Sequence, residues 1–191
     1  MGALFIAFEG LPGAGKTTVI KMLKKELQAN GKTVKIIDIE TSNKALALRT
    51  VAESYPLGNL SRILLFWVLR LQQYDLFEKM RNEADIIFAD RFWGSTVVID
   101  VCGNGIPIEV ANCFGKYIKK MPDITFFFDI PFEVAKHRKF QNTMKELDFA
   151  RRVERGYKKF AKKFNWLCVD ATEPPEAVKK HCMDIILPSL L

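Results

Sequence analysis

The stretch Gly10-Leu-Pro-Gly-Ala-Gly-Lys-Thr17 follows directly on the apolar run 3–9 and matches the pattern G-x-x-x-x-G-K-[ST]. Glycines in such a loop let the backbone turn successive N–H groups toward the phosphate oxygens of a nucleotide. The lysine reaches the β and γ phosphates, and the hydroxyl group that follows it ligates Mg²⁺. We therefore expect ATP to bind at Gly10, Gly13, Ala14, Gly15, Lys16, Thr17 and Thr18, with Thr17 as a ligand of Mg²⁺.

The sequence around this loop alternates between short apolar runs and longer segments of helical periodicity. Strands are predicted at residues 3–9, 33–39, 85–90, 124–129 and 166–169, several of which are apolar at nearly every position. Helices are predicted at 18–30, 60–82 and 149–164, where apolar residues recur about every 3.6 positions. Strands and helices that alternate in this way form a mostly parallel sheet with helices on both faces, so the predicted class is α/β.

The chain has 191 residues, of which 29 are Lys or Arg and 22 are Asp or Glu, giving a formal net charge of +7. This length and an apolar fraction of 49% predict one folded domain over 1–191 and exclude a disordered or fibrous chain. The positive charge favours anionic partners. Because no targeting or membrane-spanning segment is apparent, we expect a cytoplasmic protein without a membrane partner. Scattered, buried, reduced thiols are expected for Cys102, Cys113, Cys168 and Cys182.

An acid and a base end the predicted strand 85–90. Open α/β sheets bind their ligands at the carboxyl ends of central strands, and Asp90 and Arg91 lie at such an end. Asp90 is predicted to hold Mg²⁺ through water or to accept a proton, and Arg91 to clamp an anionic substrate. Without the phosphate-binding loop, a surface ion pair would be the better interpretation of these two residues.

Together these motifs resemble the thymidylate kinase family of P-loop nucleoside monophosphate kinases over nearly the whole chain. The similar stretches are 8–18, 64–70, 90–96, 128–135, 147–157 and 170–171. The resemblance implies a three-layer P-loop kinase fold with a five-stranded parallel sheet in the order 2-3-1-4-5. It also implies acceptor-binding helices at about 43–82, a short lid at about 138–147, and a homodimer formed through the long helix.

The activity implied by the resemblance is ATP- and Mg²⁺-dependent transfer of the γ-phosphoryl group to a nucleoside monophosphate, foremost dTMP, giving dTDP. The implied catalytic residues are Lys16, Asp90, Arg91, Arg138 and Arg151. Asp90 joins Thr17 in the implied metal site. The implied acceptor-binding residues are Glu40, Phe66, Arg70, Arg91, Ser95, Thr96 and Ile99.

Two of these acceptor-binding residues also have a basis in spacing alone. Phe66 and Arg70 are four positions apart, so they share one face of the predicted helix 60–82. An aromatic ring and a guanidinium on one face suit a flat base with an anionic tail. Periodicity without the resemblance favours a different interpretation, in which Phe66 belongs to the core and Arg70 extends to solvent.

The sequence departs from the family pattern on the acceptor side. Pro12 replaces a carboxylate of the phosphate-binding loop, Ile39 replaces an Arg after the second strand, and Ile99 replaces a Tyr beside the sugar. The lid is also shorter than usual. The three substitutions concern the acceptor and leave the ATP-binding motif intact.

Two other functions are compatible with the sequence. A deoxynucleoside kinase would share the fold but needs a carboxylate base near the sugar hydroxyl, for which Glu9 and Glu40 are candidates. A nucleotide-gated nucleic-acid-binding protein would use the paired cations that recur along several helices. Those pairs do not form one stripe interleaved with aromatic residues, which argues against a nucleic-acid partner.

Overall fold

The computed structural model describes residues 2–38, 47, 48, 50, 51, 54, 58–139 and 147–190. Its centre is a sheet of five parallel strands in the order β2-β3-β1-β4-β5, so the predicted class and strand order are confirmed. The strands are Leu4–Gly10 (β1), Val34–Ile37 (β2), Ile86–Asp90 (β3), Ile124–Asp129 (β4) and Leu167–Asp170 (β5).

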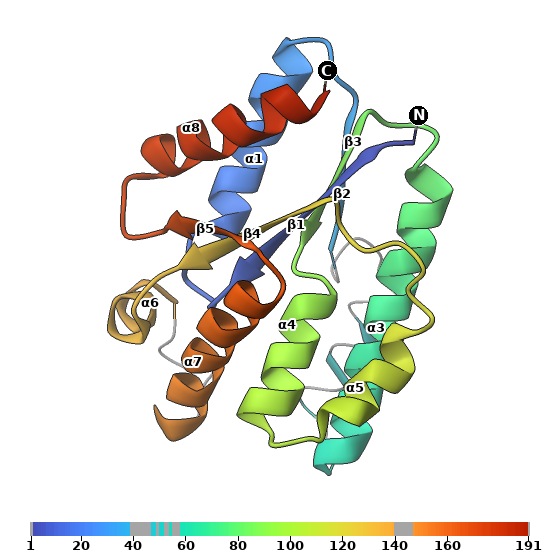
Figure 1. Ribbon diagram of the computed structural model, residues 1–191, viewed down its shortest axis with the longest axis vertical. Helices are drawn as coiled ribbons and strands as arrows, with labels where there is room; N and C mark the ends of the chain where they lie inside the picture. The colour runs from blue at the N-terminus through green and yellow to red at the C-terminus, as the bar shows by residue number, and fades with distance from the viewer. Residues whose placement is uncertain are drawn as a thin grey trace.

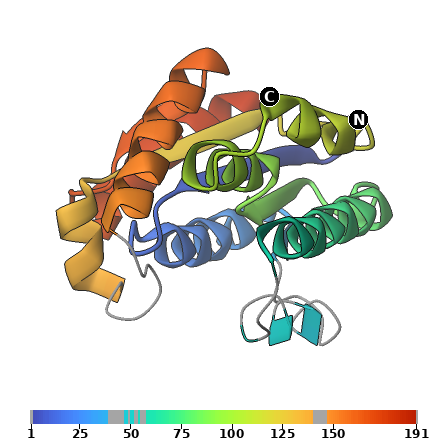
Figure 2. The ribbon, with the colours of Figure 1, turned by 90° about the horizontal axis from the view of Figure 1, so that it is seen from below.

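Helices cover the sheet on both faces. Their bounds are Lys16–Ala29 (α1), Asn59–Met80 (α3), Trp93–Val97 (α4), Ile108–Gly115 (α5), Phe132–Lys139 (α6), Leu147–Lys163 (α7) and Pro175–Ile186 (α8). A π-helix, Val98–Gly103 (η1), continues α4, and a 3-10 helix, Leu187–Leu190 (η2), continues α8. Helix α8 lies beside α1 (Figure 1), whereas α4 and α7 lie on the opposite side of the strands from α1 (Figure 2). This is the three-layer arrangement that was predicted.

The side chains of β1 alternate between the two helical layers. Phe5 stacks on Phe77 of α3, with ring centroids 4.3 Å apart, and meets Phe92 edge-on at 5.1 Å. Phe8 points to the other face, because it is three positions further along the strand. Glu9 shares the face of Phe5, so this carboxylate points into the layer formed by α3, α4 and α7.

The irregular segment α4–η1 was not predicted from the sequence. Residues 93–103 contain β-branched residues and glycines, which have low helix propensity, so tertiary packing must stabilise this segment. Its close contact with α7 requires a glycine: a Cβ atom on Gly156 would lie only 2.6 Å from the Cβ atom of Cys102. The backbone of η1 can therefore approach α7 closely.

The other expected elements agree with the structure to within a few residues. Helix α7 begins at Leu147, before the predicted start, and Phe164 lies beyond its end with a relative exposure of 38%. The strand predicted at 33–39 ends at Ile37, and Ile39 lies outside the described residues. Helices α5, α6 and α8 had no specific prediction.

The cysteines differ from expectation in one respect. All four are free, and Cys182 is buried and Cys102 half-buried, but Cys113 and Cys168 are exposed. Cys168 is exposed because β5 is an edge strand that buries only Val169. Within the described ranges, no helix has the length and apolar character needed to cross a membrane.

Candidate active site

The phosphate-binding loop occupies the turn between β1 and α1. Three of its glycines have positive φ angles, 138° at Gly10, 81° at Gly13 and 83° at Gly15. A Cβ atom at Gly10 would lie 2.7 Å from the Phe128 carbonyl oxygen, so only glycine fits where the loop leaves the sheet. Helix α1 begins at Lys16, so its N–H groups and positive dipole end face the loop.

Lys16 lies with its side chain folded along the loop. Its ammonium donates hydrogen bonds to the carbonyl oxygens of Gly10, at 3.1 Å, and Leu11, at 2.8 Å. The residue is only 5% exposed. Ala14, in the loop, is buried, and Thr18, on the first turn of α1, is exposed. The Lys16 ammonium is therefore held beside the loop that would bind the phosphates of a nucleotide.

The expected metal-binding residues are in direct contact. The Thr17 hydroxyl donates a hydrogen bond to Asp90 Oδ2 at 2.5 Å. Strand pairing causes this contact, because β1 and β3 run in parallel with Phe8 opposite Asp90. An exposed hydroxyl oxygen and an exposed carboxylate oxygen are ligands that suit Mg²⁺.

Arg91 reaches back from the end of β3 to the phosphate-binding loop. It has a φ angle of 66°, which is uncommon for a residue with a side chain, and its N–H group donates to the Phe8 carbonyl oxygen at 3.0 Å. Its Nη1 donates to the carbonyl oxygen of Gly10 at 2.8 Å. The same nitrogen lies 3.1 Å from the Tyr157 hydroxyl and 3.2 Å from Ser95 Oγ.

Arg70 comes from α3 to the same region and is almost fully buried, at 3% exposed. Its Nε donates to Thr96 Oγ1 at 2.7 Å, and its Nη1 donates to Gln73 Oε1 at 2.5 Å and to the Arg91 carbonyl oxygen at 3.3 Å. Burial lowers the pKa of Arg70 to about 10, so it stays charged at neutral pH. Arg70 therefore lies within the site and does not extend to solvent. Phe66, one turn earlier on α3, is half-buried.

Glu9 lies near the end of β1, and the sequence suggested it as a base for a sugar hydroxyl. It is fully buried, with Oε1 accepting a hydrogen bond from the Phe92 N–H group at 3.0 Å and Oε2 accepting one from Ser95. Burial raises the pKa of Glu9, against the hydrogen bonds and the charges of Arg70 and Arg91. Because it is inaccessible, Glu9 cannot serve as a base for a sugar hydroxyl. Glu40, the other candidate base and an expected acceptor contact, lies outside the described residues.

The π-helix η1 adds an acid that the sequence analysis did not single out. Asp100 is 3% exposed, and among the described residues its Oδ2 has no hydrogen-bond partner. Burial raises the pKa of Asp100 to about 7. Its neighbour Ile99, an expected acceptor contact, is half-buried against the core. An acid of this kind leaves no local sequence signal, because its burial depends on packing.

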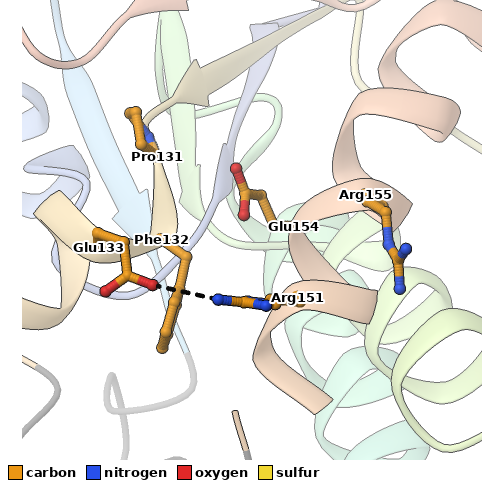
Figure 3. A pocket seen from close by; sticks show the side chains of 6 residues that line it. All are labelled: Pro131, Phe132, Glu133, Arg151, Glu154 and Arg155. Carbon is orange, nitrogen blue, oxygen red and sulfur yellow. Dashed lines mark ion pairs between the residues drawn. The ribbon is translucent and has the colours of Figure 1, made fainter. Parts of the chain in front are cut away.

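The expected lid cations lie on either side of the residues that are not described. Arg138, at the end of α6, donates from Nη1 to the Ala171 carbonyl oxygen at 2.9 Å. Arg151 of α7 points toward Glu133 of α6, with Nη2 at 3.8 Å from Oε1, beside a pocket of about 350 Å³ (Figure 3). Arg138 is thus bonded to the backbone, whereas Arg151 makes a long ion pair between two exposed side chains.

The phosphate-binding loop after β1 and the Asp-Arg pair after β3, on a parallel sheet of this order, define a P-loop nucleotide kinase, which is a phosphotransferase. A family model described as thymidylate kinase matches residues 8–182. The chain therefore belongs to the thymidylate kinase family.

Several individual thymidylate kinases are similar over nearly the whole chain. The enzyme of Acinetobacter baylyi is 28% identical over 200 residues, covering 96% of this chain and 98% of its own. That of Prosthecochloris aestuarii is 30% identical over 211 residues, covering 96% and 93%. That of Wolbachia pipientis is 31% identical over 166 residues, covering 83% and 85%.

Proposed function

We propose that this protein transfers the γ-phosphoryl group of ATP to thymidine monophosphate (dTMP), giving dTDP. The observation that carries the proposal is the contact of Arg91 Nη1 with the carbonyl oxygen of Gly10, the first residue of the phosphate-binding loop. An acceptor phosphate bound by Arg91 would lie beside the phosphates bound by the loop. Membership of the thymidylate kinase family supports dTMP as that acceptor.

The chemistry asked of the protein is positioning and charge neutralisation, because an acceptor phosphate is already ionised and needs no strong base. Lys16 would turn from the loop carbonyl groups to the β and γ phosphates. Arg91 and Arg70, joined through the Arg91 carbonyl oxygen, would hold the acceptor phosphate in line. Arg138 and Arg151 would close over the reacting groups and exclude water, whose attack would hydrolyse ATP.

Thr17 and Asp90 would hold Mg²⁺. Their adjacent oxygen atoms fit this ion, and the Thr17 hydroxyl can donate to Asp90 while a lone pair of its oxygen remains for a metal. When bound, Mg²⁺ neutralises charge on the β and γ phosphates.

The acceptor would bind along α3, with its base on Phe66 and its phosphate at Arg70 and Arg91. Thr96 and Ser95 support this arrangement by bonding to the two arginines. Ile99 would exclude a ribose 2′-hydroxyl by its bulk. We assign acceptor binding to about 43–82 and the lid to about 138–147 of a single domain spanning 1–191, acting in the cytoplasm.

A homodimer formed through α3 completes the proposal. Leu60, Leu64 and Val68 are 57%, 41% and 47% exposed and lie four residues apart, so they form one apolar stripe along the helix. An apolar stripe of this kind is typical of an interface between copies of a chain.

The experiment that tests the activity uses the purified protein with ATP, Mg²⁺ and one acceptor at a time. ADP release is measured with each nucleoside monophosphate and with each uncharged nucleoside. We expect the highest turnover with dTMP and none with thymidine. Turnover with nucleosides alone would refute phosphate as the acceptor, and no turnover with any acceptor would refute kinase activity.

A further inference from the structure

The buried carboxylate of Glu9 ends a chain of hydrogen bonds that leads to Arg91. Glu9 Oε2 is bonded to Ser95 Oγ, and Ser95 Oγ lies 2.8 Å from the Tyr157 hydroxyl oxygen. That hydroxyl oxygen lies 3.1 Å from Arg91 Nη1. Glu9, Ser95 and Tyr157 are each 0% exposed, so water cannot replace any of these partners.

With Glu9 ionised, its carboxylate determines the direction of every bond in this series of hydrogen bonds. It can only accept, so the Ser95 hydroxyl donates its single hydrogen to Glu9. Ser95 Oγ must then accept from the Tyr157 hydroxyl, and the Tyr157 oxygen is left to accept from Arg91, whose guanidinium has only donors. Burial raises the pKa of Glu9, and the hydrogen bonds from Ser95 and Phe92 and the charges of Arg70 and Arg91 act against that rise.

The backbone packs closely against one oxygen of the Glu9 carboxylate. Its second oxygen, Oε1, is bonded to the Phe92 N–H group. A Cβ atom on Gly94 would lie 2.9 Å from this same oxygen and 2.6 Å from the Trp166 ring. Close packing at Oε1 and hydrogen bonds to both oxygen atoms therefore restrain the carboxylate.

We propose that Glu9 is a positioning residue for phosphoryl transfer, which fixes the guanidinium of Arg91 through Ser95 and Tyr157. The proposal rests on the proposed function, in which Arg91 holds the acceptor phosphate. Arg91 is half-buried, and its Nη1 also donates to Gly10 of the phosphate-binding loop, so its orientation relates the acceptor to the loop. If the hydrogen bonds from Nη1 to Ser95 and Tyr157 were lost, the contact with Gly10 would be the remaining restraint on Nη1 among the described residues.

Glu9→Gln tests the chain with almost no change in volume. Glutamine has one acceptor oxygen, so either the Phe92 N–H group or the Ser95 hydroxyl meets an NH₂ group. We expect kcat/KM for dTMP to fall about 100-fold, because small misplacement of a positioning group has effects of this size. The KM for ATP should stay within about 2-fold of its original value, since the loop and Lys16 are unchanged.

Thymidine provides the readout that separates positioning from general damage. It lacks the phosphate held by Arg91, so its inhibition constant against dTMP should be unchanged in Glu9→Gln. Equal weakening of thymidine and dTMP would refute the proposal and indicate a merely structural role.

Tyr157→Phe gives an independent test that holds even where Glu9→Gln fails to fold. It removes the acceptor nearest to Arg91 in the chain, and we expect kcat/KM for dTMP to fall about 10-fold. The matched control is Tyr117→Phe, which removes a hydroxyl from an exposed side chain just after α5, outside the assigned site, and should leave activity unchanged. Full activity in Tyr157→Phe would refute the inference, whereas an inactive unmodified protein would refute the proposed function.

Discussion

The hydroxyl of Thr17 donates a hydrogen bond to Asp90 Oδ2 at 2.5 Å and so connects the first turn of α1 to the end of β3. The two residues are 73 positions apart in the sequence. They meet because the strands that precede them are adjacent in the sheet, with Phe8 opposite Asp90. Two oxygen atoms suited to Mg²⁺ are thereby placed beside the phosphate-binding loop.

Removing either oxygen should weaken the response of the enzyme to Mg²⁺. For Thr17→Ala and Asp90→Asn we expect kcat to fall on the order of 100-fold and half-maximal activity to require more Mg²⁺. The measurement is a titration of initial rate against Mg²⁺ at saturating ATP. Thr17→Ser keeps the hydroxyl and is the matched control. An unchanged Mg²⁺ response in both variants would mean that other residues hold the ion.

Lys16→Ala and Arg91→Ala should each abolish turnover while the fold survives. Each removes a cation placed against the transferring or accepting phosphate, an effect on the order of 1,000-fold in kcat. Rates are compared by ADP release, and folding by thermal unfolding monitored with circular dichroism. Lys21→Ala, at an exposed position of α1, is the control and should retain full activity. Retained activity in either active-site variant would contradict the assigned roles.

Asp100 should make the protein less stable as the pH rises. Burial raises the pKa of its carboxyl group from 3.8 to about 7, so between these values the folded protein keeps a proton that the unfolded chain has released. The contribution of this group to the free energy of unfolding therefore falls with rising pH, in total by on the order of 4 kcal/mol.

Asp100→Asn removes this dependence. Urea unfolding of both proteins between about pH 5 and pH 8 should show the variant gaining relative stability with pH. The difference should level off above the pKa of the folded protein. A constant difference across this range would show that the Asp100 carboxyl does not titrate in the folded protein with a raised pKa.

The apolar stripe of α3 should hold two copies of the chain together. We expect Leu64→Glu and Val68→Glu each to shift the protein from dimer to monomer, because a carboxylate would be buried in the interface. Sedimentation velocity at micromolar concentration measures this change. Leu187→Glu, at an exposed position of η2 with 45% exposure, is the control and should remain dimeric. A monomeric unmodified protein would remove the homodimer from the proposal.

The role of Lys16 could be predicted from the sequence, whereas the surroundings of Glu9 could not. Lys16 was predicted because its chemistry depends on a loop of eight consecutive residues, 10–17. Glu9 was noticed only as a candidate base, because its hydrogen-bond partners, Phe92 in the turn after β3 and Ser95 of α4, lie 83 and 86 positions away in the sequence. Nothing in the local sequence indicates which of these distant groups will meet a carboxylate.

Helix α3 also combines one property that the sequence predicted with one that it did not. The spacing of Phe66 and Arg70 correctly placed them on one helix, but periodicity favoured Arg70 in solvent. The structure buries it against Thr96 and Gln73 instead. A guanidinium can be buried where several acceptors surround it. Gln73 lies on α3 itself, but Thr96 and the Arg91 carbonyl oxygen are supplied only when α3 packs against α4 and the turn after β3.

The sequence by itself determined the phosphate-binding loop, the alternation of strands and helices, and the acid and base at the end of β3. These features depend on backbone conformation and periodicity, which neighbouring residues specify. Only the tertiary structure decided that Thr17 meets Asp90, that Arg91 reaches Gly10, and that Glu9 ends a buried chain of hydrogen bonds. Burial and the choice of hydrogen-bond partner depend on which distant segments pack together, so they appear only once the sheet and its helices have assembled.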